Sequence, residues 1–158
     1  MNVEIRELPA LRVAYVRHLG AYAGKSEVFA ELYARLRRWA GPRGLLGPDT
    51  RFVSIAHDHP EITSEEKLRV SVCLPIPEDV EPSDDVNVMH IPGGAFAVAR
   101  VEVATPDIPR AWESVSRWVA TNGYAGDERP CYEVIVTGPR EHPEGKHVLD
   151  ICVPVRRR

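Results

Sequence analysis

The sequence contains an internal repeat, and this repeat constrains the fold more than any other feature. Pro92 lies 83 positions after Pro9, and each proline ends a short stretch of alternating apolar and polar residues. Further along the chain the offset becomes 79, where Ile151-Cys152-Val153-Pro154 matches Val72-Cys73-Leu74-Pro75. A period of this kind indicates two copies of one structural unit, and the change of offset places a gain or loss of four residues in the loop before the helix.

Each copy is predicted to contain two strands, a helix and two further strands. Alternation with a period of two, in β-branched and aromatic residues, predicts the strands. They lie at about 3–9, 11–18, 51–56, 68–74, 86–92, 96–100, 130–136 and 151–154. The first two strands are expected to form either a β-hairpin or a bent pair interrupted at Pro9-Ala10.

Two amphipathic helices are predicted from apolar residues that recur every three or four positions. The first covers about residues 25–39 and ends at Gly41-Pro42, where glycine permits a left-handed cap and proline prevents continuation. The second begins after Asp107, a plausible capping residue, and closes at Asn122-Gly123. Its apolar face consists of Ile108, Trp112, Val115 and Val119.

These elements predict an α+β fold in a single domain over residues 1–158. Repeat 1 covers about residues 3–77 and repeat 2 about 86–156, and the proline-rich, acidic stretch at about 78–85 is a linker. One ββαββ-type unit is too small to be stable alone, so the two copies should pack together with pseudo-twofold symmetry. The predicted arrangement has two helices on antiparallel sheets around a central cleft, where ligand sites are favoured.

Composition and charge exclude several classes of protein. The formal net charge is −3 with acids and bases interspersed, so we interpret the terminal Arg156-Arg157-Arg158 as a solvated end and predict no direct nucleic-acid binding. No apolar run approaches the roughly 20 residues of a membrane helix, and the N-terminus lacks signal-peptide features, which predicts a cytoplasmic protein without membrane contact. Three cysteines without a C-x-x-C pair favour neither a disulfide framework nor a zinc site.

The strand at 130–136 carries a single carboxylate, Glu133, on the same face as Cys131 and Ile135. Such an acid either points to solvent or lies in an apolar pocket, where a cationic or hydrogen-bonding partner would offset its desolvation. The repeat places Ser54 at the position of Glu133 and Ser71 at the position of Asp150. The acids are therefore a property of the second copy, and the fold does not itself require a carboxylate at Glu133.

Short motifs along nearly the whole chain resemble those of a known family. They are Glu7-Leu8-Pro9, Val13-Ala14-Tyr15-Val16-Arg17-His18, Gly20-x-Tyr22, Asp58-x-Pro60, Glu66-Lys67-Leu68-Arg69, Ile91-Pro92-Gly93-Gly94-x-Phe96-Ala97-Val98, Gly123-Tyr124, Arg129-Pro130-Cys131-Tyr132-Glu133 and Asp150-Ile151-x-Val153-Pro154. With these motifs the chain resembles the GyrI-like or AraC-type effector-binding domains. That family includes the DNA gyrase inhibitory protein and the ligand-binding domains of multidrug-responsive transcription activators.

The resemblance implies a duplicated β-α-β architecture, with the acid that matches Glu133 in a cleft among aromatic residues, where it pairs with lipophilic cations. Candidate ligand-binding residues are therefore Glu133, Tyr15, Tyr22 and Trp118. Two further aromatic residues are assigned to core packing, because Trp112 lies on the apolar stripe of its helix and Tyr132 should face away from Glu133.

The favoured function is a stand-alone binding module for a lipophilic small molecule that is cationic or aromatic. The first alternative is a metal-independent hydrolase of strained electrophiles such as cyclopropane alkylators, in which Glu133 is the general base and Tyr15 or Tyr22 orients the leaving group. The second alternative is an interaction protein that acts on DNA gyrase or on a separate regulatory protein. The sequence does not predict the oligomeric state.

No metal or other cofactor is predicted. His57-Asp58-His59 has two imidazoles at i and i+2, but no third ligand with suitable spacing is identifiable. Cys131 is not expected to be a nucleophile, because a neighbouring carboxylate raises the pKa of a thiol and no histidine partner is evident. Gly93-Gly94 is expected to be a turn between two strands rather than part of a phosphate loop.

Overall fold

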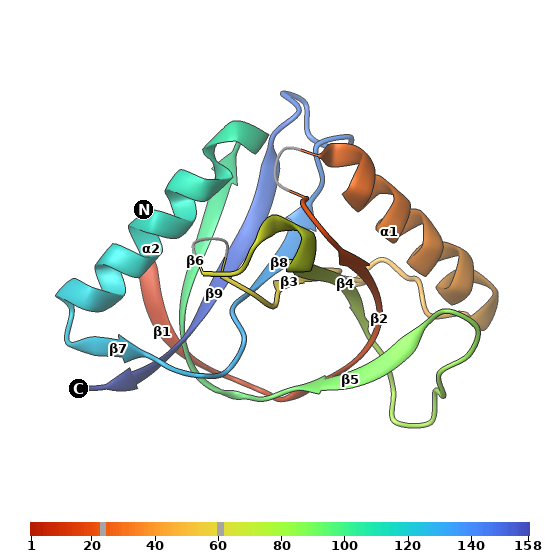
Figure 1. Cartoon of the computed structure of the whole chain (residues 1–158), viewed down its shortest axis with the longest axis horizontal. Coiled ribbons are helices and arrows are strands. Elements are labelled where there is room, and N and C mark those ends of the chain that lie inside the picture. The colour runs from red at the N-terminus through yellow and green to blue at the C-terminus, as the bar shows by residue number, and fades with distance from the viewer. Residues whose placement is uncertain (23–24, 60–61) are drawn as a thin grey trace. The chain divides into compact units, whose positions relative to one another are not determined.

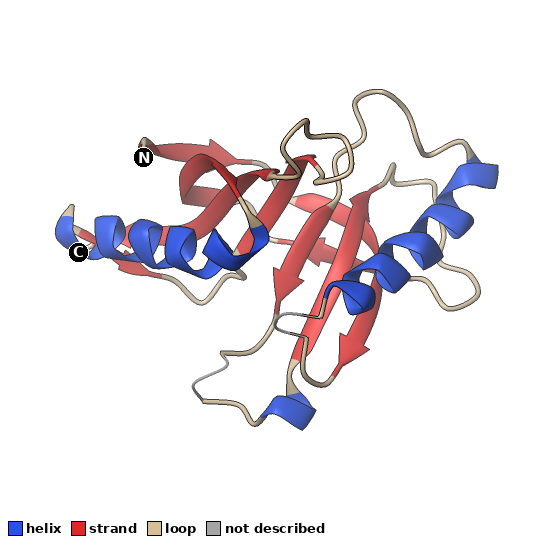
Figure 2. Cartoon of the chain, turned by 90° about the horizontal axis from the view of Figure 1, so that it is seen from above, coloured by secondary structure: helices blue, strands red, loops and turns tan. Residues whose placement is uncertain are grey.

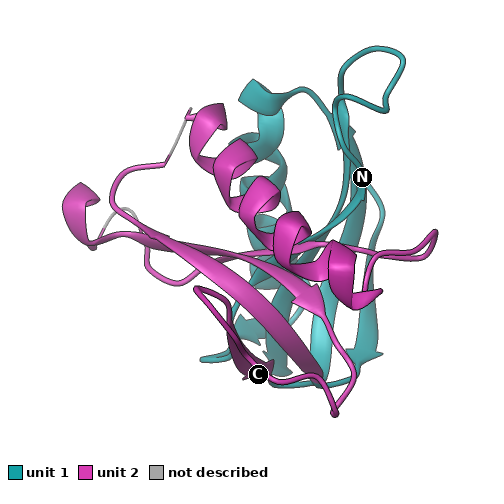
Figure 3. Ribbon diagram, turned by 90° about the vertical axis from the view of Figure 1, so that its right-hand side faces the viewer, with its two compact units in different colours: residues 1–10, 92–158 teal, residues 11–91 magenta. Residues whose placement is uncertain are grey.

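A computed structural model of the protein describes residues 1–22, 25–59 and 62–158. The chain forms two compact units, one comprising residues 1–10 and 92–158 (unit 1) and the other residues 11–91 (unit 2; Figure 3). Each unit combines one long helix with antiparallel strands, which confirms the predicted duplicated α+β fold (Figure 2). Among the described helices, none has the length and apolar character needed to cross a membrane.

Unit 2 contains four antiparallel strands and helix α1 (Ser26–Ala40). The strands are β2 (Leu11–Leu19), β3 (Val53–Ala56), β4 (Arg69–Pro75) and β5 (Asn87–Ile91). They pair in the order β3-β4-β2-β5. In this register Arg17 on β2 lies opposite Ser71 on β4. Helix α1 contacts β2 and β4, the two central strands (Figure 1).

Unit 1 repeats this arrangement with helix α2 (Ile108–Thr121). Its strands are β1 (Val3–Leu8), β6 (Gly94–Val103), β9 (His147–Arg157) and β8 (Tyr132–Thr137), paired in the order β1-β6-β9-β8. A short strand that the sequence patterns did not predict, β7 (Tyr124–Gly126), pairs with the end of β9. Arg100 on β6 lies opposite Asp150 on β9, at the position of the Arg17–Ser71 pair in unit 2.

The first strand of each sequence repeat belongs to the unit that holds the rest of the other repeat. β1 pairs with β6, and β5 pairs with β2. The compact units therefore have different boundaries from repeats 3–77 and 86–156. Of the two expectations for the first strands, the bent pair interrupted at Pro9-Ala10 is observed, and the hairpin alternative is wrong. Because the two copies are alike, either first strand can form the same backbone hydrogen bonds. Exchanging β1 and β5 between the units therefore costs little free energy.

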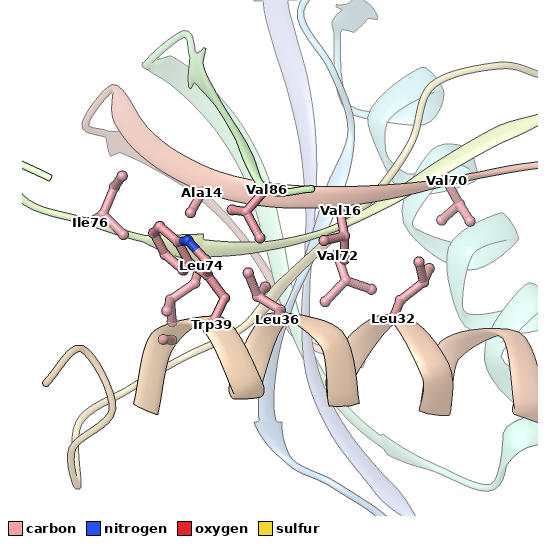
Figure 4. Close-up of a cluster of buried hydrophobic side chains, with 11 residues drawn as sticks. Ala14, Val16, Leu32, Leu36, Trp39, Val70, Val72, Leu74, Ile76 and Val86 are labelled. Carbon is pink, nitrogen blue, oxygen red and sulfur yellow. The ribbon is translucent and has the colours of Figure 1, made fainter. Parts of the chain in front are cut away.

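The core of unit 2 lies between α1 and the sheet. Leu32, Leu36 and Trp39 point from the helix toward the strands (Figure 4). They meet Ala14, Val16, Val70, Val72 and Leu74, which share one face of β2 and β4. Full burial of a leucine side chain is worth about 1.5–3 kcal/mol relative to exposure, so this interface fixes the helix on the sheet. The opposite face of the same strands carries the alternate residues, including Tyr15, Arg17 and Ser71.

Helix α1 ends at Ala40, as predicted, and a 3₁₀ turn at Gly41–Arg43 follows it. The φ angle of Gly41 is −55°, which is right-handed, so the predicted left-handed cap at this residue is wrong. The left-handed residue is Gly44, with φ of 71°. Proline at the second position of the 3₁₀ turn is tolerated because the N–H it lacks has no partner within the first turn.

The core of unit 1 has the same design with smaller side chains. Val115 and Val119 of the predicted apolar stripe are buried, while Ile108 and Trp112 are half-buried. They pack against Ala97, Ala99, Val101, Leu149, Ile151, Val153 and Val155 on β6 and β9. Asp107 precedes α2 as predicted, but its side chain makes no capping hydrogen bond.

Gly93 precedes β6, and Gly94 is the first residue of that strand. A Cβ atom at Gly93 would overlap the backbone of residues 8–10. Gly94 has φ of 134°, and a Cβ atom there would overlap the Arg129 guanidinium. That guanidinium donates hydrogen bonds to the carbonyl oxygens of Gly93, Ala95 and Val155. Gly94 therefore allows Arg129 to connect the start of β6 with β9, which is a structural role.

Candidate functional site

Glu133 lies on β8, whose alternating side chains separate two faces of the sheet. Cys131 and Ile135, its neighbours on one face, pack against the hydrophobic cluster beneath α2. Tyr132 points to the other face, where its ring meets that of Phe96 edge-on with the centroids 5.4 Å apart. Glu133 consequently faces helix α2, as the alternation of a strand requires.

The carboxylate of Glu133 accepts a hydrogen bond from the indole of Trp112 on α2, with Nε1 and Oε1 2.5 Å apart. Within the described part of the chain, no cationic side chain forms an ion pair with it. Burial raises the pKa of Glu133, and the hydrogen bond from Trp112 offsets part of this rise because it stabilises the charged form. The structure therefore gives Glu133 a desolvated carboxylate with a neutral partner.

Trp112 is a residue of this site that the sequence patterns assigned to core packing alone. It packs against the unit 1 cluster and also donates to Glu133. A usable signal was present in the sequence, because a half-buried tryptophan needs an acceptor for its indole N–H. The acid on a strand covered by the same helix was the available acceptor.

Trp118, a predicted ligand-binding residue, lies elsewhere on α2. It follows Trp112 by six residues, which turns its side chain by about 120° around the helix axis. Its ring stacks on Tyr124 of β7, with the centroids 6.1 Å apart and the planes 15° from parallel. Trp112, rather than Trp118, is the tryptophan that contacts Glu133.

Tyr15 and Tyr22, the other predicted residues, both belong to unit 2 but lie on different sides of its sheet. The ring of Tyr22 meets Phe29 of α1 edge-on with the centroids 6.0 Å apart, on the helix side. Tyr15 lies on the opposite face, where the guanidinium of Arg17 is 4.9 Å from the ring centroid. The structure does not bring the two tyrosines together within the unit.

A polar cluster that the sequence patterns missed lies on the face of unit 2 that carries Tyr15. Ser71 is 0% exposed, and its hydroxyl bonds to Arg17 Nε at 3.1 Å and to His57 Nε2 at 2.8 Å. Arg17 Nη2 also lies 3.4 Å from His57 Nε2. Burial, with the charges of Arg17 and Arg69, lowers the pKa of His57 to about 4. The imidazole is therefore neutral near pH 7. Since Arg17 Nε donates to the Ser71 oxygen, the Ser71 hydroxyl donates its own hydrogen bond to His57 Nε2.

The neighbouring Asp58 is engaged separately. Its two oxygens accept hydrogen bonds from Arg69 Nη2 and Nε at 2.9 and 3.0 Å, and one oxygen also accepts from the backbone N–H of Arg69. The Arg69 guanidinium lowers the pKa of Asp58. Residues 57 and 58 thus bind different partners, and no three His, Cys, Asp or Glu side chains of the described residues gather as a metal site would require. Pro60, which completes the motif at Asp58, lies outside the described residues.

Unit 1 has a salt bridge where unit 2 has the Arg17–Ser71 pair. Arg100 Nε and Nη2 donate to the two oxygens of Asp150 at 2.8 and 3.0 Å. The repeat offsets already pair Arg100 with Arg17 and Asp150 with Ser71. The serine at position 71, where the other copy has an acid, was a signal in the sequence for the polar cluster. It could be interpreted only once the register of the strands was known.

The cysteines provide no reactive thiolate. Burial raises the pKa of Cys131 and that of Cys152. The direction agrees with the expectation for Cys131, but the cause is desolvation rather than the carboxylate of Glu133.

Residues 1–156 match the model of the family described as GyrI-like small molecule binding domain. The chain belongs to the GyrI-like family. Similar sequences include the SPbeta prophage-derived protein YosT of Bacillus subtilis, which is 27% identical over 99% of this chain and 100% of its own length. A DNA gyrase inhibitor of Erwinia billingiae is 25% identical over 99% of both chains.

Three solved structures share this GyrI-like fold at low sequence identity. EcmrR, in a complex with DNA, matches 99% of this chain with a TM-score of 0.80 and 16% identity, and this chain spans 58% of EcmrR. A hydrolase from Listeria innocua matches 98% of this chain and 91% of its own, with a TM-score of 0.66 and 13% identity. SAV2435 bound to tetraphenylphosphonium matches 99% of this chain and 94% of its own, with a TM-score of 0.57 and 14% identity.

Proposed function

We propose that this GyrI-like domain binds a lipophilic organic cation through Glu133 and Trp112. One observation carries the proposal: a desolvated carboxylate has a neutral indole as its hydrogen-bond partner and no cationic partner in the described part of the chain. A buried charge without a counter-charge is costly, whereas a bound cation would compensate it. The family's small-molecule binding supports this interpretation.

The energetics favour a large, flat cation over a small inorganic ion. A positive charge about 4 Å from the carboxylate gains roughly 4 kcal/mol at an effective dielectric constant near 20. Contact with the Trp112 ring adds about 0.5–2 kcal/mol through the cation–π interaction. A delocalised organic cation loses less hydration on entering an apolar site than a small metal ion does, so more of this gain remains as affinity.

Tetraphenylphosphonium is a suitable probe, since it is the molecule bound to SAV2435. Its binding to the wild-type protein and to Glu133→Gln can be compared by calorimetry. We expect the substitution to weaken binding at least about tenfold, because it removes the charge and leaves the shape. Tetraphenylborate, which has nearly the same shape and the opposite charge, should not bind measurably.

Glu113→Gln is the matched control, because Glu113 is an exposed acid on the same helix as Trp112. It changes the net charge by the same amount and should leave the affinity for tetraphenylphosphonium unchanged. Equal losses in Glu113→Gln and Glu133→Gln would reduce the effect to general electrostatics. Equal binding of the phosphonium and the borate would also contradict the proposal.

A hydrolase function is the second candidate, favoured by the raised pKa of Glu133. A desolvated carboxylate is a stronger base, suited to accept the proton of an attacking water. In the opening of a cyclopropane conjugated to a dienone, the water oxygen forms a C–O bond and Glu133 takes its proton, while a ring C–C bond breaks and its electron pair moves to the dienone oxygen. That oxygen then receives the proton from Glu133 and becomes a phenol. Mass spectrometry of the mixture would detect the hydrated product, and its formation by Glu133→Gln at the wild-type rate would exclude this role for Glu133.

Interaction with DNA gyrase is a third candidate, supported only by relatives named DNA gyrase inhibitor at about a quarter identity. A supercoiling assay with gyrase and excess protein tests it directly. We expect inhibition if this chain shares the activity for which those relatives are named. Unchanged supercoiling at high excess would exclude it.

A further inference from the structure

Arg17 is an arginine that is fixed in place but lacks a carboxylate partner. Arg17 is exposed, and its guanidinium forms no salt bridge with any residue among 1–22, 25–59 and 62–158. Its Nε bonds to Ser71, its Nη2 approaches His57, and the guanidinium lies over the ring of Tyr15. The guanidinium is thus held by three uncharged groups on one face of the unit 2 sheet.

The contacts of Arg17 use only one edge of the guanidinium. Nε and one hydrogen of Nη2 face Ser71 and His57, whereas Nη1 makes no hydrogen bond to any described residue. The remaining edge, formed by Nη1 and Nη2, can also receive both oxygens of a carboxylate. Because Ser71, His57 and Tyr15 already restrict the side chain, binding an anion at this edge would immobilise little more of it.

Unit 1 demonstrates what an arginine at this register does when an acid is within reach. Arg100, at the position that corresponds to Arg17, donates two hydrogen bonds to Asp150. The counterpart of Asp150 in unit 2 is Ser71, which has no charge. Arg69, the basic residue of the neighbouring strand β4, is already paired with Asp58. The cluster therefore has one uncompensated positive charge, that of Arg17.

We propose that Arg17 is the centre of an anion-binding site in unit 2, which receives the carboxylate of a small organic monoacid. Nη1 and Nη2 bind the two carboxylate oxygens, while Ser71 and His57 hold the guanidinium from behind and Tyr15 supports its face. A single charge favours a monoanion, because a second negative charge would have no partner in the cluster. This site does not depend on Glu133 or on the binding of a cation in unit 1.

Benzoate is a suitable probe, and binding can be followed by NMR through the Nε–H signal of Arg17 and the ring signals of His57. We expect saturable shifts of both residues in the full chain. A nearby negative charge should also raise the pKa of His57, which Arg17, Arg69 and burial now lower and Asp58 raises. Absence of saturable shifts at Arg17 would overturn the proposal.

Two arginine variants separate this site from general attraction of an anion. Arg17→Gln should weaken benzoate binding at least about tenfold, because it removes the charge-assisted hydrogen bonds. Arg100→Gln, which changes the net charge equally at the matching position, should leave the affinity unchanged. Equal effects of the two substitutions would contradict the assignment.

Exchange of the partner residues gives a stricter test. Ser71→Asp should place a carboxylate at the Nε–Nη2 edge of Arg17, as Asp150 does for Arg100, and weaken benzoate binding because it compensates the charge of Arg17. Asp150→Ser should free Arg100 and produce a second set of benzoate-dependent shifts at that residue. If Ser71→Asp does not fold, Asp150→Ser still decides the matter, because unchanged signals of Arg100 at saturating benzoate would show that a freed arginine at this register does not bind the anion.

Discussion

The two units place an arginine at matching positions of their strands but give it different partners. Arg100 in unit 1 forms a salt bridge with Asp150. Arg17 in unit 2 is held by Ser71 and His57, which carry no charge near pH 7. Since the backbone register is the same in both units, the fold accepts either solution, and the side chains alone decide where charge remains uncompensated.

Comparing β8 of unit 1 with β3 of unit 2 shows an uncompensated charge of the opposite sign, in the other unit. Glu133 on β8 corresponds to Ser54 on β3, so unit 1 has an uncompensated acid where unit 2 has a neutral hydroxyl. At these two positions, among the described residues, unit 1 has an acid without an ion pair and unit 2 has an arginine without one. Duplication has produced two similar scaffolds whose candidate sites favour ligands of opposite charge.

The largest expected difference lies in the helix–sheet interfaces. Leu36 on α1 and Val115 on α2 occupy matching positions, and both are fully buried. Leu36→Ala should lower the free energy of unfolding by about 2–5 kcal/mol. Val115→Ala removes one carbon fewer and should cost only about 1–3 kcal/mol. Denaturant titration measures both, and a larger cost for Val115→Ala would show that the smaller core of unit 1 is the more tightly packed one.

The partners of the two arginines should differ in their contribution to stability. Ser71→Ala should cost about 1–3 kcal/mol, because Ser71 is fully buried and its loss leaves Arg17 Nε and His57 Nε2 without this partner. Asp150→Ala should cost about 0–1 kcal/mol, because the Arg100 side chain is 63% exposed and water can replace the carboxylate. Equal costs in thermal unfolding would mean that the salt bridge is better shielded than its exposure indicates.

The smallest expected effect is an opposite dependence of stability on pH in the two units. The pKa of Glu133 is raised by folding, so its contribution to stability is complete below the ordinary carboxyl pKa and is lost as the pH rises through the folded-state pKa. The pKa of His57 is lowered from 6.5 to about 4, so its contribution is complete above 6.5 and is lost as the pH falls toward 4.

Two substitutions separate the contributions of Glu133 and His57 to the pH dependence of stability. In Glu133→Gln the loss of stability with rising pH should disappear, and in His57→Gln the loss with falling pH between 6.5 and about 4 should disappear. Urea unfolding at half-unit steps of pH measures both curves. Parallel curves for the wild type and Glu133→Gln would show that this carboxylate is solvated in the folded protein.

Much of the fold could be predicted because the repeat and the periodicities have direct physical causes. Both helices begin and end within one or two residues of the predicted positions, since their apolar stripes must face a sheet. The exchange of β1 and β5 could not be predicted, because the two first strands have the same alternation and either partner would satisfy it. The left-handed cap assigned to Gly41 is wrong, because a 3₁₀ turn that accommodates Pro42 follows α1 and moves the left-handed residue to Gly44.

The candidate sites were less predictable than the fold. Glu133 was evident as a lone acid on an apolar strand, whereas the Trp112 contact depends on where a helix crosses that strand. The cluster around Ser71 depends on the pairing of β2, β3 and β4, which brings residues 17, 57 and 71 together. Local patterns do not contain this information, because contacts between strands are set by register.

The exchanged strands also affect the order in which the two units can fold during synthesis. Unit 2 is continuous from residue 11 to residue 91, so all of its strands emerge from the ribosome before β6 does. The strand β1 emerges before the other described strands, yet its partner β6 follows about ninety residues later. During that interval β2 is the nearest available edge, and the hairpin that the finished protein avoids becomes a competing early structure. Formation of β5 on β2 displaces that competitor, so completion of unit 2 releases the strand that unit 1 needs.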